Sequence, residues 1–401
     1  MEQVAHVEKR FNLNGRLAGP FSSFGAHTFY KKQPKTYICL CLLLAIVGYL
    51  FIAGFPLLVL ILPFSLFTVA QTTTAVEGWI LFSALLFLLL LSISISVTLA
   101  RLKFTPPHGP ELKRDRYSHL FQAIDDIRAH YQSPFLHVDR VILCDSFEIS
   151  LVKTPRIALP FLFTHTLLIG LPVLQAMKPT DFQALLAREL ARASMRHDYI
   201  ASWLVSLLPI WKQFVRVSKK AGWSTLPVYW FFRAYTRLYE TVICALLKTN
   251  FLQAEHNVLD LINDQDFLEV VTGEAVIREF INNSYWPKIR KIALRPGQPK
   301  MTPHASMTKV MRKLTRTSRF TSMVETAWKQ PDDPGASSVS LRERIHNLGH
   351  HKPYPPTSLE MTAAEHYLGT YLPSIIKVMD KKWSLGFSKV LSKHTSISKL
   401  K

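Results

Sequence analysis

Two long apolar stretches dominate the first hundred residues of the chain. No charged side chain occurs over 36–76 or over 78–100. A helix that crosses a bilayer needs about 20 consecutive apolar residues, so each stretch is long enough to do so. The pattern predicts a two-helix transmembrane hairpin, with one helix from Tyr37 to about Leu62 and the other from about Trp79 to Leu99.

The charges that flank these stretches predict the orientation of the hairpin. The connecting segment near 67–78 contains Glu77 and neither lysine nor arginine. Basic residues gather on both outer flanks: Lys9, Arg10, Arg16, Lys31, Lys32 and Lys35 before the first stretch, and Arg101, Lys103, Lys113, Arg114 and Arg116 after the second. Cytoplasmic flanks carry the excess of lysine and arginine. We therefore expect an integral membrane protein in which both ends of the hairpin, and with them the soluble domain, lie in the cytoplasm.

Beyond the hairpin, the spacing of apolar residues changes to that of a soluble domain. Helical periodicity runs over 111–130, and short apolar runs predict strands within 138–152 and a further strand within 157–170. A helix is then expected over about 180–197, with Thr180 as its N-terminal cap. The predicted fold class is α+β, predominantly helical, with two N-terminal transmembrane helices and a small edge sheet.

Two later apolar stretches are ambiguous. The first, 199–208, is too short to span a bilayer, and we expect a buried or interfacial helix there. The second, 230–247, is long and aromatic but carries Arg233, Arg237 and Glu240. We expect it to pack at the membrane surface, with those charged groups in the interface.

These patterns divide the chain into five segments. They are a cytoplasmic basic N-terminal segment (1–36), the transmembrane hairpin (37–100), the core of the soluble domain (101–287), a basic connecting segment (288–335), and a C-terminal helical region with a basic tail (336–401).

The charge of the chain adds candidate partners beyond the lipid bilayer itself. The formal net charge is +20, and 288–329 is strongly basic, which predicts a weakly structured segment. A basic residue near an anionic membrane contributes about 1 kcal/mol, so anionic lipid headgroups are one candidate partner and a solvated surface is the alternative. Nucleic acid is not favoured, because no recognised binding fold accompanies the charge. The stretch 381–401 places Trp383 and Phe387 at helical spacing among lysines, as in an interfacial helix or a frayed tail.

The most informative motif is Arg188-Glu189-Leu190-Ala191-Arg192. Zinc proteases of the zincin type carry H-E-x-x-H on such a helix. Residues i and i+4 share a helix face, so two imidazoles can bind one metal while the glutamate takes a proton from the bound water. Arginine stays protonated and offers no lone pair. We therefore expect that Arg188 and Arg192 hold no zinc and that the chain has no cofactor.

The segments around this motif resemble the HtpX-like membrane metallopeptidases, relatives of the CAAX prenyl proteases. The resemblance spans roughly 105–383. It includes the strand region 166–174, then 178–187, and then the ligand helix ending in Arg196-His197, in the order of that family. The resemblance implies a zincin-like metallopeptidase domain, with Glu189 at the position of the family's general base and His197 near the pocket.

Other positions match the family only in part. Residues 253–259 resemble the helix that carries the third zinc ligand, with Glu255 at the ligand position and Leu259 where the family has an aspartate. Glu148 stands where an asparagine of the edge strand is expected. The segment 340–348 resembles the family's T-H-P-S-x-x-x-R-I region, but it lacks the His-Pro pair. The resemblance thus implies a metallopeptidase scaffold whose metal site is degenerate.

The roles of the charged residues remain open at this point. Glu189 forms either an ordinary i, i+3 salt bridge with Arg192 on a polar helix face, or part of a site in which Arg188 or Arg192 fills the place of the metal. In the second interpretation, guanidinium groups would neutralise Glu189 and Glu255 in forked geometry. A third arrangement, which rests on residue type alone, is a metal site formed by Glu189, His197, Glu255 and His256.

Three functions fit these observations. The first is a membrane-anchored pseudopeptidase that binds polypeptides or regulates a protease partner. The second is an active zinc metalloendopeptidase with unusual ligands, and the third is a basic scaffold at the membrane surface. We favour the first, because a carboxylate without a metal has little means to produce a nucleophilic water at neutral pH.

Overall fold

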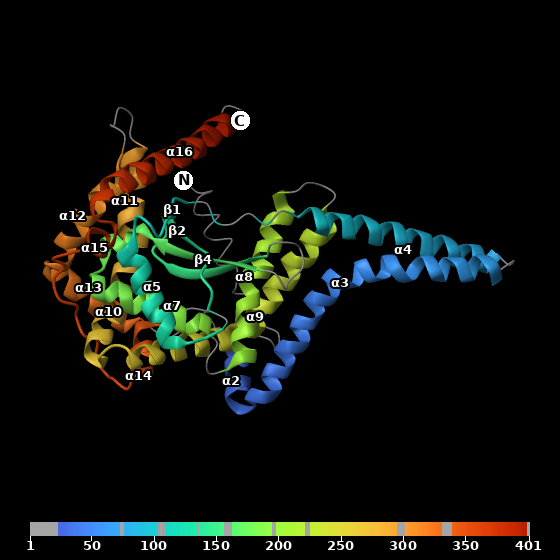
Figure 1. The fold of residues 1–401 in the computed structure, drawn as a ribbon, viewed down its shortest axis with the longest axis horizontal. Helices are drawn as coiled ribbons and strands as arrows, with labels where there is room; N and C mark the ends of the chain where they lie inside the picture. Colours follow the sequence, from blue (N-terminus) through green and yellow to red (C-terminus); the bar gives the residue numbers. More distant parts are fainter. Residues whose placement is uncertain are drawn as a thin grey trace.

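A computed structural model describes residues 23–72, 76–102, 104, 107, 109–134, 136–155, 163–194, 198–220, 225–294, 301–330 and 339–398. It shows a mostly helical body with a small sheet and a long helical hairpin that projects from one side (Figure 1). The expected predominantly helical class, with a small sheet and two apolar helices near the N-terminus, is confirmed at this level.

The helices follow one another along the chain, and most belong to the body. They are α2 (Ser23–Lys32), α3 (Pro34–Thr72), α4 (Val76–Arg101), α5 (Ser118–Tyr131), α6 (Leu171–Ala176), α7 (Pro179–Ser194), α8 (Tyr199–Lys220), α9 (Leu226–His256), α10 (Asp264–Phe280), α11 (Trp286–Ala293), α12 (Pro303–Thr315), α13 (Ser318–Lys329), α14 (Leu341–Asn347), α15 (Ala363–Leu368) and α16 (Leu372–Ser398), with short helical turns η2 (Asn257–Asp260), η3 (Ile281–Tyr285) and η4 (Gly369–Tyr371).

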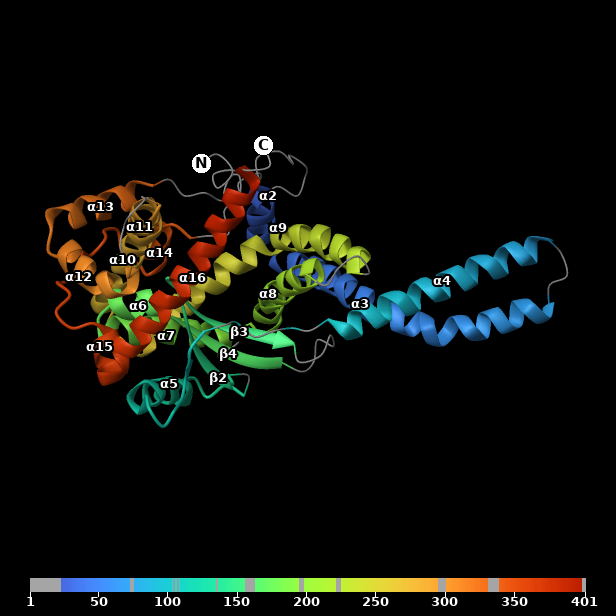
Figure 2. The ribbon, with the colours of Figure 1, turned by 90° about the horizontal axis from the view of Figure 1, so that it is seen from above.

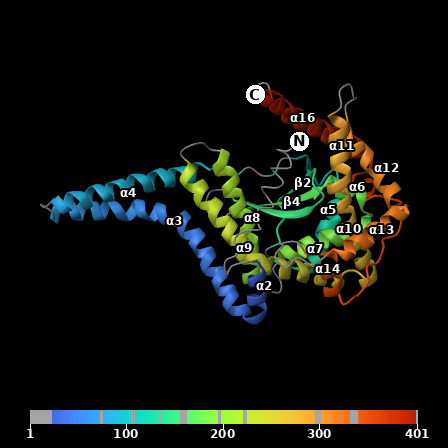
Figure 3. The same cartoon turned by 180° about the vertical axis from the view of Figure 1, so that it is seen from behind.

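The projecting hairpin consists of the second half of α3 and α4, which run side by side (Figures 2 and 3). Both helices are long and apolar enough to cross a membrane, over 34–71 and 78–101. Large apolar side chains such as Leu60 and Phe64 are about three-quarters exposed. The first helix continues past its predicted end at Leu62 and through Pro63. A proline removes one backbone hydrogen bond, and an apolar helix can continue where the neighbouring bonds remain.

The first half of α3 packs on the body instead of standing free. Its Tyr37 and Cys41 side chains are buried, and the Tyr37 hydroxyl donates a hydrogen bond to the backbone carbonyl of Val242 on α9. In return, the Tyr235 hydroxyl of α9 donates to the carbonyl of Leu44 on α3, at 2.8 Å. The apolar hairpin and α9 therefore share one packed core.

Helices α8 and α9 contribute most of that core, which is rich in aromatic rings. Buried members include Trp211, Phe214, Phe232 and Tyr239, and their rings stack or meet edge to face. The expectation that 199–208 forms a buried or interfacial helix is confirmed, since most of these residues are buried within α8. Whether 230–247 touches a membrane stays a prediction.

The sheet has four strands in the order β1-β2-β4-β3. They are β1 (Glu111–Leu112), β2 (Arg140–Cys144), β3 (Ile149–Pro155) and β4 (Phe163–Gly170). Strand β2 is parallel to β4, and β3 pairs antiparallel to β4 with Leu151 opposite Leu167. Strand β3 is thus an edge strand, and it contacts helices α7 and α8. Residues 157–162 of the strand predicted within 157–170 lie outside the described residues.

Three details of the helical body differ from the prediction. Residues 111–112, at the start of the helix expected over 111–130, form strand β1, and α5 begins only at Ser118. Helix α7 begins at Pro179, so Thr180 lies in its first turn and is not the cap. Proline suits the first helical position, where its missing N–H has no partner to lose. The basic segment is also not weakly structured where it is described: α11, α12 and α13 occupy most of it. Apolar side chains at helical spacing bury one face of α12 and α13, as Met307, Met311 and Phe320 show, and this burial outweighs the repulsion between exposed charges.

The shared core leads to a prediction about truncation. A fragment that starts at residue 101 would expose the surfaces of α8 and α9 that α3 covers, and exposed apolar surface of this kind drives association. We expect this fragment to aggregate in detergent-free buffer, whereas the full chain in detergent elutes as a single species in size-exclusion chromatography. A monodisperse fragment with one cooperative unfolding transition would contradict this arrangement.

Candidate functional site

Helix α7 carries the arginine motif into the interior of the body. Its apolar residues, such as Phe182 and Leu186, are fully buried, which fixes how the helix is turned. Residues one turn apart share a face, so Arg188 and Arg192 project from the same side of α7. The two arginines nevertheless bind different carboxylates.

Arg188 enters a network of buried charges. Its guanidinium donates to both carboxylate oxygens of Glu274, at 2.5 and 2.8 Å, and to Glu255 at 3.3 Å. Arg344 donates to the same two carboxylates, with Nε 2.8 Å from Glu255 and Nη2 2.8 Å from Glu274. Glu255 and Glu274 are at most 2% exposed as side chains. Helices α7, α9, α10 and α14 each contribute one of the four residues.

The surroundings of the network keep Glu274 ionised. Burial alone would raise the pKa of Glu274, but the guanidiniums of Arg188, Arg344 and Arg278 outweigh burial and hold that pKa well below its ordinary value. Arg188 and Arg344 also lie over the ring of Phe251, 5.0 and 5.3 Å from its centre. Charge and desolvation are thus balanced within the protein itself, as a buried network requires.

Glu189 forms a second pair, separate from the first. Its carboxylate accepts two hydrogen bonds from Arg192, at 2.9 and 2.6 Å, and a third from the backbone N–H of Leu151, at 2.7 Å. Both interpretations of the arginines therefore describe contacts that are present: the i, i+3 pair of Glu189 with Arg192, and the pairing of Arg188 with Glu255.

These contacts also occupy the outer edge of β3. Leu151 lies at a position whose N–H points away from β4, and Glu189 binds that group. Two residues further on, the side-chain amide of Gln213 donates to the carbonyl of Lys153 at 3.0 Å. Burial, and then the charge of Arg192, lower the pKa of Lys153 to about 8. Side chains thus already use two of the groups with which an added strand would pair.

The remaining residues singled out from the sequence do not join this site. Glu148 lies in the turn before β3 and accepts a hydrogen bond from Ser146 at 2.7 Å. His256 is exposed, and Leu259 packs against the apolar core. His197 lies outside the described residues.

Sequence analysis missed Glu274, Arg278 and Arg344 as members of the site. Arg344 falls within the 340–348 segment already noted for its resemblance. Glu274 was signalled only by its setting, since it is a single acid within the apolar run Val270-Val271-Thr272-Gly273-Glu274-Ala275-Val276. Acids are rarely buried without a partner, so that pattern predicts a cation nearby, but it does not say which one.

The residues present do not fit a zinc ion. Arg188 and Arg192 occupy the positions of the two expected imidazoles and have no lone pair to donate. Within the described residues, no group of three or more His, Cys, Asp or Glu side chains is placed to hold a metal ion. The carboxylates that remain, Glu189, Glu255 and Glu274, are bound by arginines.

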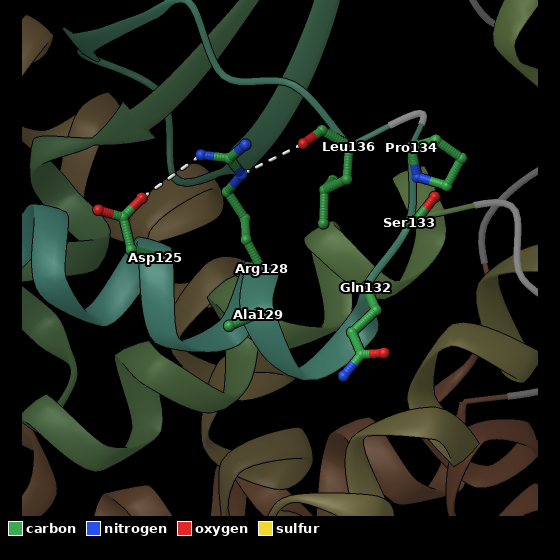
Figure 4. A pocket seen from close by; sticks show the side chains of 7 residues that line it. All are labelled: Asp125, Arg128, Ala129, Gln132, Ser133, Pro134 and Leu136. Carbon is green, nitrogen blue, oxygen red and sulfur yellow. Dashed lines mark hydrogen bonds and ion pairs between the residues drawn. The ribbon is translucent and has the colours of Figure 1, made fainter.

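An open hollow of about 450 Å³ lies elsewhere, at the C-terminal end of α5 (Figure 4). Arg128 is bound within it: its guanidinium donates to the carbonyl of Leu136 at 3.2 Å and pairs with Asp125 at 3.4 Å. The residues that line it are Asp125, Arg128, Ala129, Gln132, Ser133, Pro134 and Leu136. No residue of the arginine motif takes part, so this hollow is separate from the candidate site.

Comparison with known proteins adds no relative. No family model matches the chain, and neither a curated protein nor a solved structure matches it. The resemblance to HtpX-like metallopeptidases therefore rests on the motifs alone.

The buried network should be costly to break. Removing one partner of a buried ion pair leaves an uncompensated charge and lowers stability by about 3 kcal/mol. We expect Arg344→Leu to lower the free energy of unfolding by this amount in denaturant titrations. Arg312→Leu is the matched control, because its pair with Glu365 is about one-third exposed and should contribute less than about 1 kcal/mol. Equal losses for the two variants would count against a special role of the network.

The depressed pKa of Glu274 also predicts a pH dependence. The unfolded chain binds a proton near the ordinary value of 4.5, whereas the folded chain does so only at lower pH. The stabilisation is therefore fully present above pH 4.5 and is lost as the pH falls through the folded pKa. We expect the free energy of unfolding to fall below pH 4.5, and to fall less steeply in Glu274→Gln. Parallel curves for the two proteins would refute this assignment.

Proposed function

We propose that this chain is a membrane-anchored pseudopeptidase, an inactive relative of the HtpX-like metallopeptidases that binds polypeptides or regulates a protease partner. One observation carries the proposal. At the two helix positions where such an enzyme would hold zinc, α7 has Arg188 and Arg192, and both guanidiniums are engaged by carboxylates. Arg188 also contacts Glu255, the residue that aligns with the third ligand of the family.

The environment of Glu189 supports an inactive site. A general base needs a free lone pair directed at the water that it deprotonates. In this chain, Arg192 and the Leu151 N–H occupy the Glu189 carboxylate from two sides. A carboxylate whose oxygens already accept three hydrogen bonds is poorly placed to take a proton from a water.

The occupied edge of β3 bears on the mode of binding. A polypeptide that adds as a further strand would have to displace Glu189 from Leu151 or Gln213 from Lys153. Such strand addition depends on free backbone groups along an exposed edge. The closed edge favours the regulatory form of the proposal, in which another surface of the domain meets a protease partner.

The proposed location follows from the flanking charges. Two helices could span a membrane, and the lysines and arginines on their outer flanks favour a hairpin whose ends face the cytoplasm. We place the soluble domain in the cytoplasm, at a bacterial inner membrane.

Metal content tests the proposal directly. We expect the full chain, purified in detergent, to contain far less than one zinc per molecule by mass spectrometry, and we expect no cleavage of an unfolded substrate such as casein. Glu189→Gln should leave both results unchanged. One zinc per chain, together with proteolysis that Glu189→Gln abolishes, would establish the active metallopeptidase instead.

A further inference from the structure

The C-terminal half of α8 and the N-terminal half of α9 lie where the apolar hairpin leaves the body (Figures 1 and 3). Phe104, which follows α4, meets Phe214 of α8 edge to face, with ring centres 4.8 Å apart. From the other helix of the hairpin, Phe51 of α3 stacks on Phe231 of α9 with ring centres 3.7 Å apart. Leu99, near the end of α4, is buried in the same core. The hairpin thus holds these two helix ends at its root.

The first turns of α9 expose large apolar side chains at this root. Trp230 is 58% exposed and Leu226 is 37% exposed, although both residue types are mostly buried on average. Pro227 is exposed beside them. Tryptophan is enriched where a membrane meets water, because its ring is apolar while its N–H can bond to water or to headgroups. A bilayer crossed by the hairpin would meet Trp230 at its surface.

Basic side chains gather at the same root without acids to balance them. Between residues 199 and 254 the only acid is Glu240, and it pairs with Lys212 at 2.7 Å. Four further basic residues are exposed here: Arg101 at the end of α4, and Arg216, Lys219 and Lys220 in the last turns of α8. Within the described residues, none of these four pairs with a carboxylate. Their charge is therefore available to an anionic partner.

Arg233 is held by aromatic rings instead of by an acid. Its guanidinium carbon lies 5.4 Å from the ring centre of Trp230 and 5.8 Å from that of Tyr229. Its Nη1 also donates a hydrogen bond to the Tyr229 hydroxyl at 3.3 Å. A ring positions a guanidinium without neutralising its charge, so the group can still bind a phosphate.

We propose that these helix ends bind the phosphate headgroups of anionic lipids in the bilayer that the hairpin crosses. We define the α8–α9 corner as the residues Arg216, Lys219, Lys220, Leu226, Trp230 and Arg233. Basic side chains next to an exposed tryptophan match a surface that has phosphates outside and acyl chains beneath. A nucleic acid would use the same charges, but the apolar hairpin beside the corner favours lipid.

The fold keeps the corner close to this lipid surface. Because the hairpin would tether the body to the membrane, binding is intramolecular and has a high effective concentration. Only the first turns of the stretch 230–247 take part, since Val242, Ile243 and Leu246 are buried in the core shared with α3 and α8. The proposal rests on the proposed membrane location and is independent of the pseudopeptidase assignment.

Hydrogen exchange on the full chain in lipid nanodiscs tests the proposal. The first N–H groups of a helix have no partner within it, so exchange over 226–230 reports what covers the start of α9. We expect these amides to exchange at least about fivefold more slowly in discs with about 30% phosphatidylglycerol than in pure phosphatidylcholine discs. This difference should shrink in about 0.5 M salt, which screens the charges.

Two pairs of substitutions separate the corner from the rest of the surface. Lys219→Ala with Lys220→Ala should weaken binding about 25-fold, at about fivefold for each lysine, and remove the difference between the discs. Lys309→Ala with Lys313→Ala is the matched control. Both of these lysines are exposed on α12, at the end of the body away from the hairpin (Figure 1), and the difference should persist in this variant.

The outcomes distinguish this proposal from the membrane location on which it rests. Size-exclusion chromatography shows whether the chain stays in the discs, and a chain that leaves them would refute the location and the headgroup site together. Equal exchange in the two kinds of disc, for a chain that stays in both, would overturn the headgroup site alone. An RNA oligonucleotide that protects 226–230 in phosphatidylcholine discs, where phosphatidylglycerol does not, would overturn it in favour of nucleic acid.

Discussion

The packing of the soluble domain depends on one buried network of guanidinium and carboxylate groups. Arg188, Glu255, Glu274 and Arg344 come from four different helices and meet at hydrogen-bond distance. A buried charge without a partner costs several kcal/mol, so a shift of any one of these helices would strand a charge in the core. The network therefore specifies how α7, α9, α10 and α14 fit together. Apolar packing alone is less directional and selects one arrangement of the helices less strictly. A metal ion bound by the same helices would impose a similar constraint, by coordination instead of ion pairs.

Helix α9 connects this network with the apolar hairpin. Its last turn carries Glu255, and its middle carries Tyr235 and Val242, which exchange hydrogen bonds with α3. A continuous α-helix of 31 residues is about 46 Å long and resists bending along its length. The apolar hairpin and the charged network thus both pack against one rigid helix. The first half of α3 is therefore part of the folded domain.

The sequence predicted the features that depend on local patterns. Uncharged stretches revealed both apolar helices, and the periodicity around the arginine motif predicted α7. Glu255 was singled out only by the resemblance to the metallopeptidases, and its pairing with an arginine was one of the interpretations left open. Glu274 and Arg344 could not be assigned in this way, because 86 and 156 residues separate them from Arg188 and no local pattern encodes that distance. High charge also concealed α12 and α13, whose apolar stripes are narrow. Trp383 lies in a stretch expected to be either an interfacial helix or a frayed tail. In the structure its ring stacks on Trp286 of α11, and the exposed apolar side chains of α16 are Val378 and Leu385.

The charge of the site argues against a metal even apart from the missing ligands. Arg188, Arg344 and Arg278 contribute three positive charges, and Glu255 and Glu274 contribute two negative ones. A dication about 5 Å from a single guanidinium would be repelled by about 7 kcal/mol at an effective dielectric constant of about 20. Restoring two histidines at 188 and 192 would remove one of these guanidiniums but leave Arg344 and Arg278 in place. Conversion of this site into a zinc site would therefore require changes on α10 or α14 as well as on α7. Arg278 on α10 and Arg344 on α14 would otherwise still repel the ion.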